Sequence, residues 1–270
     1  MLPSERAREK RNAELDAASQ PWTKEVDRAA RVRLGALGDS LVIDEYSVTH
    51  VLKRRAGTYV EAYRLFSHLT TLSLADLIDV IAAVPLVDEL YSGTTEEWIS
   101  GVNQIFRQHR IGYKFVDDEL IPFEDDELMQ NVIEPTLGLL IGEKFREARA
   151  SYKEALEEIA DGKPGDAMTD AGRALQQTFQ ALGCEGKMLG PLLRDAKQKG
   201  LLGNIDAPLT EGIEKLYNWA SANRNELSDA HNSADLLVED GWLMIHVVGA
   251  LIQRLAAGTP RQAQPEGQDR

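Results

Sequence analysis

One short segment gathers residue types that can do chemistry on RNA. Arg224-Asn225-Glu226-Leu227-Ser228-Asp229-Ala230-His231 places a guanidinium, an amide and an imidazole within eight residues. A guanidinium binds phosphate through a planar fork and keeps its charge at any working pH. An imidazole titrates near neutral pH and can carry a proton. Arg224, Asn225 and His231 are therefore the candidate catalytic residues.

This trio suits the cleavage of RNA without a metal, because RNA carries its own nucleophile, the ribose 2′-hydroxyl. Arg224 would stabilise negative charge on the phosphoryl oxygens. His231 would take the proton of the hydroxyl or give one to the leaving oxygen, and Asn225 would orient one of the two. The spacing alone also fits a structural reading, in which Arg224 caps a helix end and His231 begins the next helix.

The elements around this segment are predicted to be two helices. In the first, over 206–227, the inward stripe that includes Ile213 and Tyr217 continues to Arg224, where a charge is costly unless it is paired. Seven residues on a helix turn through ~700° and rise ~10 Å, so His231 shares a face with Arg224. The second helix, over 233–256, is apolar nearly all round from Trp242 to Leu251, which predicts burial inside a bundle or against a second copy.

The rest of the chain predicts a mainly α protein with one short β-hairpin. Alternating apolar residues and an Asp117-Asp118 turn predict the hairpin over 111–123. The acidic run that follows favours a helix start, so we expect an N-terminal helical domain over 1–125, a helical bundle over 126–257 and a disordered polar tail over 258–270. Helices are expected at 22–37, 59–69, 73–82, 94–110, 127–161 (bent near Pro135 and Gly142), 167–182 and 191–200.

Composition bounds the function. The net charge of −14 excludes a non-specific nucleic-acid coat, but residues 1–60 carry 11 Lys and Arg against 9 Asp and Glu. RNA would have to bind at a small basic site or with help from the N-terminal part. Lys53-Arg54-Arg55 is either a solvated helix end or an RNA-docking patch. The single Cys184 is expected to act as a small hydrophobe in a reducing cytoplasm. The longest apolar run is far too short to cross a membrane, and no signal peptide is visible.

Several other residues have two readings. Asp170 and Arg173 lie on the expected second helix of the bundle, where they either support the Arg224 site or are simply solvated. His246 is expected to be a core or interface histidine. No phosphate loop, dinucleotide fingerprint or zinc spacing occurs, so we expect no cofactor and no metal.

The segment RNELSDAH, between the helix LTEGIEKLYNWASAN and an apolar helix, resembles the signature of HEPN domains of the abortive-infection C-terminal (Abi_C) type. The stretch YKFVDDELIPFEDDELMQNVIEPTLGLL resembles the hairpin and connector of AbiJ-like phage-defence proteins. The helices in SYKEALEEIADGKPGDAMTDAGRALQQTFQAL resemble the first two bundle helices there. The resemblance covers about residues 111–256, with 1–110 as an AbiJ-type N-terminal region. Gln176 stands where related helices often carry Glu, and Asn232 where many relatives have Gly.

The resemblance implies a HEPN-like bundle that forms a homodimer, with Arg and His of two subunits sharing one cleft. It implies a metal-independent endoribonuclease, a cytoplasmic toxin used in antiphage abortive infection or in a toxin–antitoxin system. An RNA substrate and an antitoxin or phage-derived trigger would be its partners. Two alternatives stay open: a catalytically inactive HEPN protein that binds RNA or another protein, and a helical adaptor whose N-terminal domain recognises a phage protein.

Overall fold

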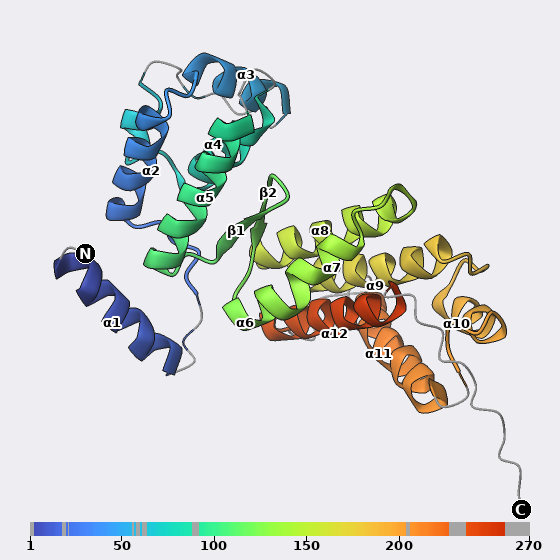
Figure 1. Ribbon diagram of the computed structural model, residues 1–270. Helices are drawn as coiled ribbons and strands as arrows, with labels where there is room; N and C mark the ends of the chain where they lie inside the picture. Colours follow the sequence, from blue (N-terminus) through green and yellow to red (C-terminus); the bar gives the residue numbers. More distant parts are fainter. Residues whose placement is uncertain are drawn as a thin grey trace, which may run out of the picture. The chain divides into compact units, whose positions relative to one another are not determined.

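The computed structural model describes residues 3–17, 20, 22–55, 57, 60, 64–87, 92–203, 206–226 and 236–256. Over these residues the chain is mainly α-helical with one two-stranded antiparallel hairpin, which confirms the predicted fold class at this level (Figure 1). The chain divides into two compact units, Met1–Asp126 and Glu127–Arg270. Each unit is described by itself below.

The first unit consists of helices followed by the hairpin. Its α-helices are α1 (Pro3–Ala17), α2 (Arg28–Ser40), α3 (Glu45–Arg55), α4 (Leu74–Ala83) and α5 (Ser92–His109). Two short 3-10 helices, η1 (Phe66–His68) and η2 (Val84–Leu86), and the strands β1 (Tyr113–Val116) and β2 (Glu119–Pro122) complete it. Strand β1 pairs with β2 from Tyr113 opposite Pro122 to Val116 opposite Glu119. The predicted Asp117-Asp118 turn joins them with both residues at positive φ, as a two-residue hairpin turn requires.

The start of α2 differs from the sequence prediction. The helix expected over 22–37 begins only at Arg28, because Asp27 is its N-cap and accepts a 2.7 Å hydrogen bond from the Ala30 N–H. The preceding segment is extended instead. The Thr23 N–H donates to the Arg110 carbonyl and the Gly112 N–H donates to the Thr23 carbonyl, so the segment pairs with the chain entering β1.

Lys24 fastens the same segment to the hairpin. Its ammonium nitrogen donates to the carbonyl oxygens of Gly112 (2.9 Å) and Phe123 (2.8 Å). Trp22 packs on the Phe123 ring at 5.0 Å between centroids. The extended segment therefore exchanges helical hydrogen bonds for contacts with residues about ninety positions later in the chain.

The helix predicted over 59–69 is wrong for the part that the structure describes. Residues 64–69 hold only the 3-10 helix η1, preceded by Arg64 at φ 56°. The Phe66 N–H donates to the side chain of Glu45 rather than to a helical carbonyl, at 3.1 Å. The Phe66 ring lies against α2 at Gly38, where a Cβ would be 2.2 Å from the ring, and contacts Trp98 edge-on. Tertiary contacts therefore determine the conformation of this segment.

The second unit is a bundle of longer helices. It contains α6 (Asp126–Leu128, which begins at the unit border), the π-helical turn η3 (Met129–Ile133), α7 (Glu134–Leu139), the 3-10 helix η4 (Glu143–Phe145) and α8 (Arg146–Ala160). These are followed by α9 (Pro164–Ala181), α10 (Leu189–Gln198), α11 (Ala207–Glu226) and α12 (Val238–Ala256). The expected bent helix over 127–161 is therefore two separate helical stretches, with the chain broken around Gly142. Pro135 does not end the first stretch, because it lies just after the π-helical turn and the helix continues through it to Leu139.

Helix α9 is the centre of the bundle, since it packs against α8, α10, α11 and α12. Helical spacing in the sequence predicts an inward stripe of Ala167, Ala171, Ala174, Leu175, Thr178 and Leu182, and all of these are buried except Leu182, which is half-buried. Small side chains on this stripe allow the neighbouring helices to approach closely. The central helix therefore fixes where α11 and α12 can lie.

A buried polar cluster fixes the other side of α12. Thr136 Oγ1 donates to the Gly249 carbonyl (3.1 Å), and the Tyr152 hydroxyl donates to the Ile245 carbonyl (3.3 Å). Gln253 Nε2 donates to the Val132 carbonyl in the π-helical turn (2.9 Å). These bonds join α12 to η3, α7 and α8.

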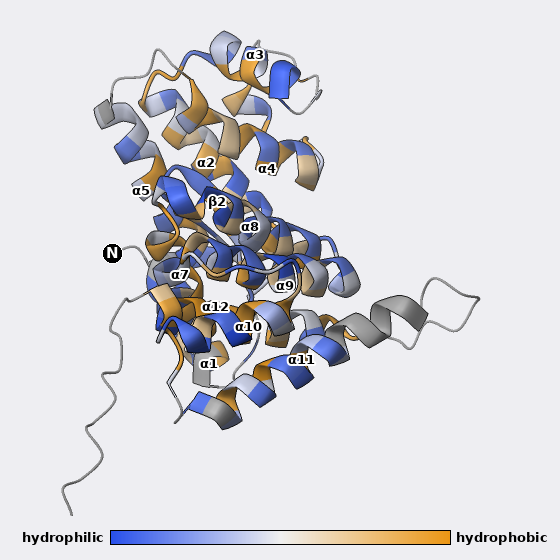
Figure 2. Ribbon diagram, turned by 90° about the vertical axis from the view of Figure 1, so that its right-hand side faces the viewer, coloured by the Kyte–Doolittle hydropathy of each residue, from blue (hydrophilic) through white to orange (hydrophobic). Residues whose placement is uncertain are grey.

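Helix α12 begins later than predicted. Residues 236 and 237 are not helical, and the Leu237 N–H donates to the Asp240 carboxylate, as at a capped N-terminus. The helix buries Trp242, Ile245 and Val248, yet Leu243 is 51% exposed. The predicted burial of every side of α12 is therefore not achieved within a single chain. Hydrophobic residues are nevertheless frequent along α12, whereas hydrophilic ones are frequent along α11 (Figure 2). Residues 258–270, predicted to be disordered, lie outside the described residues.

We predict that Gly249→Ala destabilises the second unit by about 1–3 kcal/mol, the range for overpacking a close contact. A Cβ at this position would be 2.5 Å from the Tyr152 hydroxyl and 2.8 Å from Val132 Cγ1. Gly138→Ala is the matched control, because that helical glycine has no heavy atom near its Cβ position, and alanine should stabilise it by up to ~1 kcal/mol. Urea unfolding followed by circular dichroism measures both. Equal stability of Gly249→Ala and the wild type would contradict the close approach.

Candidate functional site

The predicted catalytic residues fall at the end of α11 and beyond it. Arg224 and Asn225 occupy the last turn of that helix, and their side chains are not among those described. His231 lies outside the described residues, in the connection that leads to α12. The segment RNELSDAH therefore begins in the last turn of one long helix of the bundle and ends before the next.

Two sets of contacts hold α11 in the bundle. In its middle, Gln176 of α9 donates a 2.6 Å hydrogen bond to the Tyr217 hydroxyl. The Tyr217 ring lies over Gly172, where a Cβ would be 2.9 Å from it. These contacts anchor the same helix whose last turn carries Arg224 and Asn225.

At the start of α11, a buried ion pair joins it to α12. Asp206 Oδ1 accepts a 2.7 Å hydrogen bond from Arg254, and its other oxygen accepts the Gly203 N–H at 2.8 Å. Asp206 is only 5% exposed, so its carboxylate is largely desolvated, whereas the Arg254 side chain is 30% exposed. No local sequence pattern indicates this pair, because the two residues are 48 positions apart.

Asp170 and Arg173 meet each other on α9. Arg173 Nη1 is 2.8 Å from Asp170 Oδ1 and 3.5 Å from a Glu154 oxygen on α8. The Arg173 side chain is 49% exposed, whereas that of Asp170 is 14% exposed. Burial raises the pKa of the Asp170 carboxyl, with the Arg173 charge opposing this and the Glu154 charge adding to it. The two residues form a local ion pair at the bundle surface.

Two further residues have settled packing roles. His246 stacks on Trp242 with ring centroids 5.5 Å apart and an angle of 18° between the planes. Cys184 is buried, and burial raises the pKa of its thiol, which keeps the sulfur protonated. A protonated thiol is a poor nucleophile, in line with the interpretation of Cys184 as a small hydrophobe.

The described part of the chain offers neither a metal site nor a membrane span. Within it, no group of three or more His, Cys, Asp or Glu residues is placed to hold a metal ion. None of its helices combines the length and apolar character required to span a bilayer.

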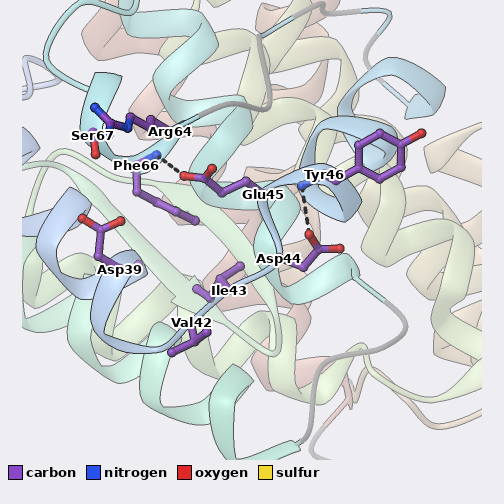
Figure 3. A pocket seen from close by; sticks show the side chains of 10 residues that line it. Asp39, Val42, Ile43, Asp44, Glu45, Tyr46, Arg64, Phe66 and Ser67 are labelled. Atoms are coloured by element: carbon purple, nitrogen blue, oxygen red, sulfur yellow. Dashed lines mark hydrogen bonds between the residues drawn. The ribbon is translucent and has the colours of Figure 1, made fainter.

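The first unit carries an open hollow of about 810 Å³ that the sequence analysis did not single out (Figure 3). The end of α2, the start of α3 and the η1 segment line it. Asp44 is already used as a cap, since it accepts the Ser47 hydroxyl and N–H, and these bonds lower its pKa. Glu45 binds the Phe66 N–H. The lining contains no histidine, lysine or cysteine, and it combines three carboxylates with the Arg64 guanidinium.

Val42 at the rim of this hollow is unusual, because it is 87% exposed and has φ 53°. A β-branched residue in the left-handed region is strained.

The start of the neighbouring helix α3 could have been predicted from the sequence, because Asp44 stands three residues before Ser47 in an N-cap pattern.

Comparison with known proteins gives no match for this chain among family models, curated proteins or solved structures.

We predict that the two ion pairs of the bundle differ in their effect on stability. Asp206→Ala leaves Arg254 without its carboxylate and the Gly203 N–H without its acceptor, so it should cost roughly 2–4 kcal/mol. Arg173→Gln removes a half-exposed pair and should cost no more than ~1 kcal/mol. Chemical unfolding of both variants checks the difference. Similar losses of unfolding free energy in the two variants would overturn the assignment of Asp206–Arg254 as the ion pair that anchors α11.

Proposed function

We propose that the protein is a HEPN-type endoribonuclease that cleaves RNA without a metal and acts in abortive infection or a toxin–antitoxin system. The segment Arg224-Asn225 to His231 carries the proposal, because it combines a phosphate-binding guanidinium with a proton-transferring imidazole. Its position from the last turn of α11 to the connection before α12, the two last long helices of the bundle, supports the same function. Here the 2′-hydroxyl of the substrate attacks the adjacent phosphate.

The anchoring of α11 bears on the geometry of such a site. Position 224 follows Tyr217 by seven residues on one continuous helix, so helical periodicity places the two positions on the same face. Tyr217 is the residue that meets α9 through Gln176. Position 224 therefore shares a helix face with position 217, and Asp170 and Arg173, whose ion pair extends to Glu154 on α8, stay candidate supporting residues of the proposal.

The exposed side of α12 supports a homodimer. Leu243 is exposed, and Val247 and Ala250 follow it at helical spacing with partial or full exposure. A second copy that covered this stripe would bury it, and two copies would bring two RNELSDAH segments into one assembly. The alternative function, a catalytically inactive RNA-binding or protein-interaction module, keeps the same bundle but needs no proton transfer.

We predict that the purified protein cleaves cellular RNA in excess EDTA. The products should end in 2′,3′-cyclic phosphates and 5′-hydroxyls, because the nucleophile belongs to the substrate. End-group analysis with phosphatase and kinase treatment distinguishes these ends from 3′-hydroxyls. Activity that disappears in EDTA and returns with magnesium would refute the mechanism, whereas binding without cleavage would favour the alternative function.

We also predict that His231→Ala and Arg224→Ala each lower the cleavage rate by at least ~10²-fold, through lost proton transfer and lost charge stabilisation. Arg224→Lys should rescue poorly, since an ammonium lacks the bidentate fork. Asn225→Ala should have a milder effect. Mixing the two inactive variants should restore some activity if each cleft draws on two chains. His68→Ala, an exposed histidine of the first unit, is the control that should keep full activity. A fully active His231→Ala protein would exclude His231 as the catalytic residue.

A further inference from the structure

His109, the last residue of α5, is a buried histidine with one ring nitrogen unsatisfied. Its side chain is 1% exposed, and Nδ1 lies 2.9 Å from Asp27 Oδ2. Nε2 is buried and has no hydrogen-bond partner. A neutral ring fits this site, because Nδ1–H can donate to the carboxylate while Nε2 keeps only a lone pair.

Three elements meet around the turn of α5 that carries His109. Asp27 precedes α2 and uses its second oxygen to cap that helix at the Ala30 N–H. Arg33 of α2 donates to the Gln108 side chain, next to His109. Helix α1 covers the same turn of α5, since Asn12 Nδ2 donates to the Gln108 carbonyl at 3.1 Å. The charges that act on His109 are therefore Asp27, Arg8 on α1 and Arg33 on α2.

These surroundings oppose protonation of the ring. Burial lowers the pKa of His109, and Asp27 opposes this through its hydrogen bond and charge, while Arg8 and Arg33 lower the pKa further. A proton added at Nε2 would create a buried N–H with no acceptor, and an unsatisfied buried donor is destabilising. The protonated ring is better accommodated where water can reach it.

We propose that His109 is a pH-sensitive latch that keeps α1 docked on α5 when the ring is neutral and releases α1 when the ring is protonated. Only α1 is expected to leave, because the chain after it is fastened separately. Thr23 pairs with the backbone entering β1, and Lys24 binds two carbonyls of the hairpin region. The released helix carries four basic and four acidic side chains, so acidification would expose a highly charged segment without a basic excess.

The sign of the effect follows from linkage. A histidine whose pKa is lower in the docked state than its ordinary 6.5 is neutral in both states at pH 7.5, and docking then loses nothing. As the pH falls below about 6.5, the released state binds a proton that the docked state refuses, and docking weakens. Each unit by which the two pKa values differ weakens docking up to tenfold. The Asp27 carboxyl does not interfere between pH 7.5 and 5.5: burial would raise its pKa, but the Ala30 N–H and His109 hold it below 3.8.

Hydrogen exchange of the full-length protein, followed by mass spectrometry and corrected for intrinsic rates, tests the latch. An isolated helix of this length is marginal in water, so protection of 3–17 reports docking. We expect these residues to lose protection at pH 5.5 relative to pH 7.5, while 98–106 of α5 keep theirs. His109→Asn, which can still donate to Asp27 but cannot be protonated, should abolish the pH response. His68→Asn should respond like the wild type.

Unchanged protection of 3–17 between the two pH values, or an equal response in His109→Asn, would overturn the proposal. If His109→Asn does not fold, the ring resonance of His109 in the wild type, titrated by NMR, decides the question. We expect its titration midpoint to lie below 6.5, and a midpoint at or above 6.5 would also overturn the proposal. Neither measurement depends on RNA cleavage.

Discussion

The close approach of helices that only glycine permits is the constraint on which the bundle depends. Gly172 on α9 leaves space for Tyr217 of α11, and Gly249 on α12 leaves space for the Tyr152 hydroxyl of α8. At Gly241, also on α12, a Cβ would lie 2.4 Å from Ile159 Cδ1 of α8. Each of these contacts lets a backbone approach a neighbour that a larger residue would push away. The position of α11, and with it the last turn that carries Arg224, follows from this packing.

Local patterns were sufficient to predict the elements whose hydrogen bonds are local. The hairpin was predicted from alternation and from Asp117-Asp118, and the inward stripe of α9 from spacing such as Ala167 and Ala171. Two of the failures share one cause, which is a partner far away in the sequence. The backbone around Thr23 binds residues near Ile111, and the Phe66 N–H binds Glu45, so helical periodicity in these segments was misleading.

The same limit applies to the candidate site. Arg224, Asn225 and His231 could be proposed from residue types and spacing, because the three residues lie within one short segment of the sequence. The contacts that anchor their helix could not. Gln176 and Tyr217 are 41 residues apart, and nothing in the neighbourhood of either predicts the bond between them. His109 and Asp27 are 82 residues apart, and only the fold reveals that one of them satisfies a ring nitrogen of the other.

The π-helical turn η3 marks a place where the chain can change its length. A π-helical turn encloses one residue more than an α-helical turn, so removing one of the residues 130–132 would leave an ordinary α-helix. Met129 and Ile133, both buried, would then be three positions apart instead of four, and residues at either spacing share a helix face. The hydrogen bonds from Gln253 to the carbonyls of this turn would then be lost. Homologues one residue shorter in this connector, with a different side chain at position 253, would therefore keep the same bundle.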